Sequence, residues 1–256
     1  VDGSTLGADS TFSGTITNTN TGATGTLAVV KDGSTTLTLS GANTYTGGTT
    51  VQGGTLALGT DGSLSPTGAV ALIGSGATFS LAAANGLRTI GALSSTLADT
   101  FVQLGGNRLV FGDASDQTFA GTVNGTGSSD IYKQGSGTFT FTGVNNASLI
   151  VSAGTVALSG AGTLSATRGV VVSGGATLSI SGANGDRSIG GLVGGNANST
   201  VALGNNTLTL NTSTGQQFNG VIEGTGGVVK TGTGLSVFSE QNTYTGGTTV
   251  NAGSLH

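Results

Sequence analysis

The chain has 256 residues, of which 50 are glycine, and only 18 are charged, namely 7 Lys or Arg and 11 Asp or Glu. Glycine at roughly three times its usual ~7 per cent share excludes a helical bundle. The net charge of −4 includes no basic cluster, which excludes nucleic acid and electrostatic contact with a membrane. Without cysteine there is neither a disulfide framework nor a thiolate metal site.

The predicted elements are short strands. Glycine or asparagine leads repeatedly into an apolar-polar-apolar triplet, and such alternation with threonine in the polar position is typical of half-buried strands. The spacing from Leu37 to Leu255 averages about 24 residues over nine intervals. In chain order the triplets are Leu37–Leu39, Leu56–Leu58, Phe79–Leu81, Leu109–Phe111, Phe139–Phe141, Val156–Leu158, Leu178–Ile180, Leu208–Leu210 and Leu235–Val237, and a further one begins at Leu255.

A longer repeat lies above the short one. Gly76–Leu81 returns 99 residues later as Gly175–Ile180, and Phe119–Gly121 returns as Phe218–Gly220. A string of sandwich domains has no reason to repeat one strand motif every ~24 residues, whereas coils stacked on near-copies of themselves do. The predicted organisation is one segment, residues 1–256, with long repeats at approximately 12–118, 119–217 and, in part, 218–256.

One motif supports a resemblance to a known family. Thr44–Val51 recurs unchanged at Thr243–Val250, and a Lys-x-Gly sequence precedes each copy, at Lys31 and Lys230. These stretches resemble the passenger-associated β-strand repeat of bacterial autotransporters, and a third copy around Lys133 lacks Tyr-Thr-Gly-Gly. The resemblance implies an all-β fold, a single right-handed parallel β-helix (β-solenoid) for which the repeat length gives about ten coils. It also implies export through a C-terminal barrel to the bacterial cell surface or the extracellular space.

Catalytic and cofactor chemistry is not expected. The single histidine is His256, the last residue, and no motif for a catalytic triad, a phosphate loop or a metal site occurs. We therefore predict no enzyme, no cofactor and no metal. The residues singled out form a structural repeat motif, in which the tyrosines pack over the coil and the asparagines satisfy corner amides: Asn43, Tyr45, Gly47, Gly48, Asn242, Tyr244, Gly246 and Gly247. Stacking of the tyrosines on sugar rings is the alternative.

Two other function classes stay open. A carbohydrate-active β-helix would need two carboxylates ~5 to ~9.5 Å apart, and Asp113, Asp116 and Asp130 are the candidates. An ice-binding solenoid would need threonine rows that align from coil to coil. Alternating threonines occur at Thr15, Thr17, Thr19 and Thr21 and again at Thr138, Thr140 and Thr142.

The remaining charged residues are predicted to decorate turns. Lys31, Lys133 and Lys230 occupy equivalent places about four coils apart, so they cannot form one ligand site. Arg88 and Arg187 lie in equivalent Asn-Gly-x-Arg turns, where Asp186 is expected to pair with Arg187.

The predicted function is that of a structural and adhesive segment of an autotransporter-like surface protein. It would act as a β-helical stalk or fibre in self-association (aggregation, biofilm) or in adhesion to a host or surface. With so few charges, two rods meet little repulsion and can associate sideways or end to end. Expected partners are therefore further copies of the chain, with surface glycans or a host-cell receptor as alternatives. Contact with nucleic acid or membrane is not expected.

Overall fold

The computed structural model describes residues 7–18, 25–195 and 198–256. Their contacts group into two compact units, Val1–Ile131 and Tyr132–His256, which are described separately. Every regular element in the described ranges is a β-strand, and none of their segments is a helix that could cross a membrane.

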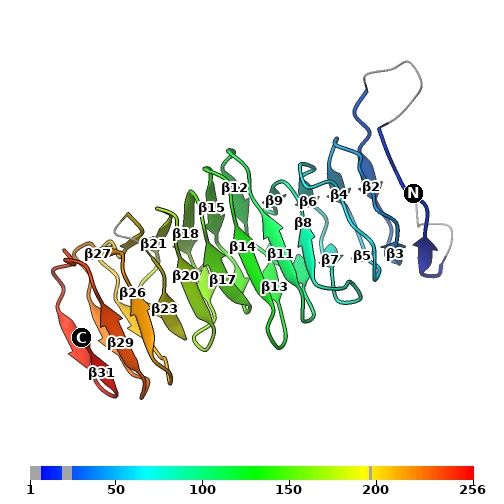
Figure 1. Cartoon of the computed structure of the whole chain (residues 1–256). Coiled ribbons are helices and arrows are strands. Elements are labelled where there is room, and N and C mark those ends of the chain that lie inside the picture. Colours follow the sequence, from blue (N-terminus) through cyan, green and yellow to red (C-terminus); the bar gives the residue numbers. More distant parts are fainter. Residues whose placement is uncertain (1–6, 19–24, 196–197) are drawn as a thin grey trace. The chain divides into compact units, whose positions relative to one another are not determined.

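The first unit consists of short strands that follow one another closely along the chain (Figure 1). They are β1 Ser10–Phe12, β2 Val29–Lys31, β3 Thr36–Leu39, β4 Thr49–Val51, β5 Thr55–Leu58, β6 Val70–Leu72, β7 Thr78–Ser80, β8 Leu87–Thr89, β9 Leu93–Ser94, β10 Phe101–Gln103, β11 Arg108–Phe111, β12 Gln117–Phe119 and β13 Thr122–Asn124. Strand β14, Asp130–Lys133, crosses the boundary between the units.

These strands pair in parallel ladders, one strand per coil. The main ladder of the first unit runs β1-β3-β5-β7-β10-β13, and a second runs β2-β4-β6-β9. Strands β3, β5 and β7 lie side by side in Figure 1. From β3 onward, successive register partners in the main ladder are 19, 23, 23 and 21 residues apart.

The core of each coil comes from the residues that alternate inward. In the first unit one inward column consists of Leu37, Leu56, Phe79, Val102 and Val123, which are paired in register and at most 4 per cent exposed. Identical stacked positions bury apolar side chains against each other and leave the alternate side chains facing outward.

The second unit has the same construction. Its strands are β15 Thr138–Phe141, β16 Val144–Asn145, β17 Ser148–Val151, β18 Thr155–Gly160, β19 Thr163–Leu164, β20 Gly169–Val172, β21 Thr177–Ala183, β22 Arg187–Ile189, β23 Gly191–Val193, β24 Thr200–Ala202, β25 Leu208–Leu210, β26 Gln216–Phe218, β27 Val221–Glu223, β28 Val228–Lys230, β29 Leu235–Phe238, β30 Thr248–Val250 and β31 Ser254–Leu255. The ladder β15-β18-β21-β24-β27 carries the inward column Phe139, Val156, Leu178, Val201 and Ile222.

The prediction of an all-β parallel solenoid is confirmed, with one correction to the length of a coil. Leu109 and Leu208 do not belong to the main ladders, because β11 pairs with β8 and β25 pairs with β22 and β28. The true partners of Phe79 and Leu178 are Val102 and Val201, each 23 residues on. The same apolar alternation occurs on a second face of the coil, which made the predicted repeat of about 24 residues too long. Right-handedness and the organisation as one segment stay predictions.

Candidate functional site

Asn43 lies inside the coil and bonds three coils together. Only 1 per cent of its surface is exposed. Its Oδ1 accepts the backbone amide of Ile16 at 2.9 Å, and its Nδ2 donates to the carbonyl oxygens of Gly41 at 2.9 Å and Ser63 at 3.0 Å. The side chain therefore satisfies backbone groups that the corner would otherwise leave unpaired. No described residue other than glycine has a positive φ, so asparagine contributes through its amide and not through a left-handed backbone.

Tyr45 is likewise enclosed, with 1 per cent exposure. Its hydroxyl lies 2.6 Å from Thr49 Oγ1, and burial raises the pKa of the phenol above its ordinary value. Gly48 has φ +85°, and a Cβ on Gly47 would lie 2.6 Å from the carbonyl oxygen of Leu27. The motif is a tight corner closed over a buried ring, so Tyr45 has no face on which a sugar could stack.

The second copy repeats this geometry in a more open setting. Asn242 Oδ1 accepts the amide of Ile222 at 2.8 Å, and the hydroxyl of Tyr244 lies 2.5 Å from Thr248 Oγ1. Gly247 has φ +82°, nearly that of Gly48. Tyr244 is half-buried, and a Cβ on Gly246 would lie 2.4 Å from the carbonyl carbon of Gly226.

The sequence predicted that the three lysines lie exposed on turns, and this prediction is wrong. Lys31, Lys133 and Lys230 are at most 2 per cent exposed. Strand alternation points each side chain inward, where the ammonium bonds to backbone carbonyls of the neighbouring turns. Lys31 Nζ donates to Asp32 O at 2.7 Å, Gly33 O at 2.9 Å and Gly53 O at 3.0 Å. We refer to these arrangements as carbonyl cages.

The other two cages have the same chemistry. Lys133 Nζ donates to the carbonyl oxygens of Gln134 at 2.8 Å, Gly135 at 2.9 Å and Gly137 at 2.8 Å. Lys230 Nζ donates to those of Gly232 and, at 3.4 Å, Thr212. Burial lowers the pKa of Lys31 and Lys230, whereas the carbonyl dipoles around each ammonium stabilise its charge. In each cage the ammonium lies inside the coil and binds the backbone carbonyl groups of the turn.

Arg88 and Arg187 fasten the turns of adjacent coils. The guanidinium of Arg88 donates to Gly62 O and Thr60 O in the preceding coil, both at 2.6 Å, and also to carbonyls of its own turn. Arg187 makes the equivalent bonds to Gly162 O and Gly160 O, both at 2.7 Å. Asp186 is a local partner of Arg187 through its backbone, since its carbonyl oxygen accepts a hydrogen bond from Arg187 Nη1 at 2.9 Å, whereas its carboxylate oxygen Oδ1 accepts the amide of Thr207 at 2.7 Å.

Two of the three candidate acids make contacts within the fold. Asp130 is 8 per cent exposed and holds Arg108 through two bonds, Nε to Oδ1 at 2.5 Å and Nη2 to Oδ2 at 2.8 Å. Asp113 Oδ1 accepts the amide and hydroxyl of Ser115 within its own turn. Within residues 7–18, 25–195 and 198–256 no three His, Cys, Asp or Glu side chains group as a metal site would require.

A row of threonines that the alternating pattern did not predict aligns from coil to coil. Register pairs Thr138 with Thr155, Thr155 with Thr177 and Thr177 with Thr200, all half-buried on the outer face of the ladder. Each of these threonines directly precedes the inward apolar residue of its strand, which is the signal that could have revealed the row. The other candidates fall elsewhere: Thr15 and Thr17 are not in a strand, and Thr19 and Thr21 lie outside the described residues.

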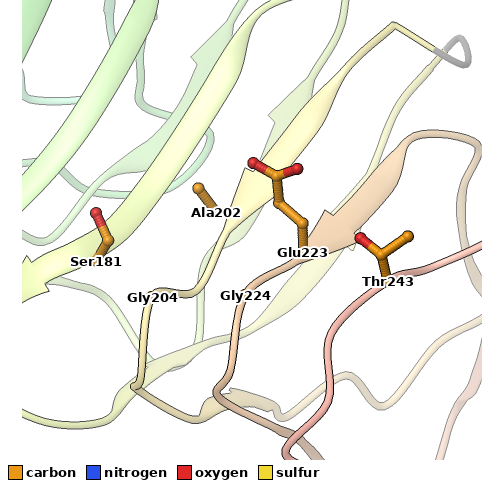
Figure 2. Close-up of a pocket in the computed structure, with 6 residues that line it drawn as sticks. All are labelled: Ser181, Ala202, Gly204, Glu223, Gly224 and Thr243. Atoms are coloured by element: carbon orange, nitrogen blue, oxygen red, sulfur yellow. The ribbon is translucent and has the colours of Figure 1, made fainter.

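A hollow of about 480 Å³ lies on the outer face of the second unit. Figure 2 shows the side chains of Ser181, Glu223 and Thr243 pointing to one side of the ribbon, with the methyl group of Ala202 between the first two. Gly204 and Gly224 line it with backbone alone. Ala202 and Glu223 are neighbours in the register of β24 and β27. These residues match no spacing motif, so nothing in the sequence marks them as a site.

Comparison with known proteins agrees with this construction. The passenger-associated-transport-repeat family matches residues 29–58, 131–158 and 228–256, and each match contains one of the carbonyl cages. The chain is also 35 per cent identical, over 156 residues, to the adhesin BmaC autotransporter of Brucella suis biovar 1 (strain 1330). The similar region covers 56 per cent of this chain and 4 per cent of that relative. No solved structure matches the chain.

The fold defines the class of protein as a parallel β-solenoid, and three stretches of it match the passenger repeat. The chain thus carries three passenger-associated-transport repeats and is similar over part of its length to one autotransporter adhesin. This class indicates a cell-surface or extracellular location.

Proposed function

We propose that the chain is a non-catalytic stalk segment of a surface adhesin, which works through self-association and adhesion. The observation that carries the proposal is the charge-poor outer wall. All three lysines are internal, Arg88 and Arg187 bind backbone carbonyls, and Asp130 pairs with Arg108. Two such walls carry few charges, which are mainly dispersed carboxylates, and threonine and serine hydroxyls would be available for hydrogen bonds between them.

Each hydrogen bond between two walls would contribute only about 0.5 to 1.5 kcal/mol, so association requires many bonds acting together. Sedimentation across protein concentration and salt tests the self-association, together with clumping of bacteria that display the segment. Reversible oligomers at high protein concentration, with clumping, are the expected result. A strict monomer and dispersed bacteria would refute the self-association and leave adhesion to another surface.

Ice binding is a second candidate, favoured by the aligned row from Thr138 to Thr200. The adjacent outward column is less regular, since register places Ala157 and Ala202 beside Thr140 and Ser179. A measurement of thermal hysteresis tests this candidate. Hysteresis that Thr177→Lys abolishes would favour ice over the adhesive function.

A further inference from the structure

The hollow beside Glu223 is a shallow, open depression with polar groups on its rim. Its volume of about 480 Å³ lies within the ~300 to ~1,000 Å³ of small-molecule sites. Adjacent coils are ~4.8 Å apart, so the side chains on its rim follow one another at about the length of one sugar ring. Figure 2 shows the order Ser181, Ala202, Glu223, Thr243 across the hollow.

The polar groups on the rim of the hollow remain available for hydrogen bonds to a ligand. Within the part of the chain that the structure describes, the Glu223 carboxylate and the Thr243 hydroxyl make no hydrogen bond or ion pair. The Ser181 hydroxyl bonds to Ser179 Oγ at 2.8 Å and keeps further acceptor capacity. A ligand in the hollow would therefore gain hydrogen bonds without breaking any that stabilise the coil.

The glycine backbone that forms the floor of the hollow is held in place by hydrogen bonds within the protein. The carbonyl oxygen of Gly204 accepts the amides of Thr225 at 2.7 Å and Gly226 at 2.8 Å. Gly204 has φ +61°, and a Cβ there would lie 2.7 Å from Ser181 Cα. A rigid glycine backbone keeps the hollow open and lowers the ordering cost of binding.

The chemistry of the rim selects the ligand. One carboxylate can accept two hydroxyl groups, the serine and threonine hydroxyls can donate or accept, and the Ala202 methyl offers an apolar contact. A carboxylate opposes anionic ligands. No metal-binding group of acids occurs in the described ranges. These features fit an uncharged ring that carries several hydroxyls and has one C–H face.

The first unit supplies an internal comparison. The residues 99 positions earlier are Ala82, Gln103 and Asn124 in place of Ser181, Ala202 and Glu223. Gln103 pairs with Asn124 in the same register as Ala202 with Glu223, and Gly105 has φ +59°, close to that of Gly204. The backbone thus repeats, whereas the carboxylate, the hydroxyl and the small side chain that opens the hollow occur together in the second unit.

We propose that this hollow is a subsite for a neutral, hydroxyl-rich saccharide, an inference that rests on the adhesive function proposed above. Glu223 binds a pair of ring hydroxyls, Ser181 and Thr243 bind the neighbouring ones, and the ring lies over Ala202. A longer polysaccharide continues across the uncharged positions Thr200 and Ser179 of the same face.

The test is calorimetric titration of the full chain with four probes: the neutral cellohexaose and mannohexaose, a heparin hexasaccharide and a chitosan hexamer. We expect one neutral probe to bind with a stoichiometry of one. Glu223→Asn and Ala202→Gln, which install the first unit's residues, should each weaken binding about tenfold or more. The first unit already carries these side chains at the equivalent positions, Gln103 and Asn124. Circular dichroism checks that the variants fold.

The reciprocal change provides a gain of function. Introducing Ala82→Ser, Gln103→Ala and Asn124→Glu together should add a second, weaker binding event, because the residue 99 positions before Thr243 is Val144, which has no hydroxyl. Absence of binding by both neutral probes, binding that neither Glu223→Asn nor Ala202→Gln weakens, or binding of the chitosan hexamer alone would overturn the proposal. If displayed bacteria still clump or adhere in any of these cases, the subsite fails and the adhesive function stands.

Discussion

Replacing Lys133 by methionine tests whether the carbonyl cages hold the coils together. The substitution keeps the aliphatic stem and removes the ammonium that donates to Gln134 O, Gly135 O and Gly137 O. Hydrogen bonds of a charged group contribute about 1.5 to 3 kcal/mol each, so three sum to at most about 4.5 to 9 kcal/mol, and the several kcal/mol that burying the ammonium costs offsets part of this sum. The difference predicts that Lys133→Met lowers the free energy of unfolding by about 2 to 4 kcal/mol.

Urea unfolding followed by circular dichroism measures this loss, and hydrogen exchange of the amides around Gly135 shows whether the opening is local. The other lysines serve as matched comparisons. Lys31→Met should cost about as much, because its ammonium has three carbonyl partners within 3.0 Å. A cost below about 1 kcal/mol for Lys133→Met, or a gain, would show that desolvation of the charge outweighs its hydrogen bonds.

Three further changes have defined outcomes. Because burial raises the pKa of Tyr45, the folded state holds the phenol proton more tightly than the unfolded state does, so the free energy of unfolding should fall as pH rises above about 10. Tyr45→Phe should remove this alkaline loss of stability in urea melts. Tyr244→Phe is the control. Gly47→Ala should lower the free energy of unfolding by about 2 kcal/mol or more through its clash with Leu27 O, while Gly106→Ala, with open space around its Cβ, should cost less than about 1 kcal/mol. Arg108→Ala, which strands the Asp130 carboxylate, should cost about 1 to 3 kcal/mol in the same assay, and Asp130→Asn should cost less if the stranded charge is the reason.

The sequence predicted the ladders because inward residues repeat with strand alternation. Thr36–Leu39 and Thr55–Leu58 show this pattern fully, and they pair in register. Strand β10 was not predicted because it has a single fully buried inward residue, Val102, between Phe101 and Gln103. Its periodicity is too short to distinguish it from a loop.

The site was harder to predict because it depends on which coils become neighbours. A lysine before a turn is usually solvated, and the carbonyls that enclose Lys31 include that of Gly53, 22 residues further on. The same limit applies to the hollow, whose Ser181 and Thr243 lie 62 residues apart in the sequence. Local patterns predict strands and corners, whereas stacking decides which side chains share a surface.

The internal position of the basic residues affects how fast extracellular proteases can digest the chain. Trypsin-like proteases cut after lysine or arginine in chain segments that can extend into their active site. The chain has seven such residues, and its three lysines lie inside cages while Arg88 and Arg187 are bound to carbonyls of two coils. Cleavage at these five positions must wait for a coil to open, so its rate follows the population of the opened form. The bonds that close the turns thus also protect the segment from digestion.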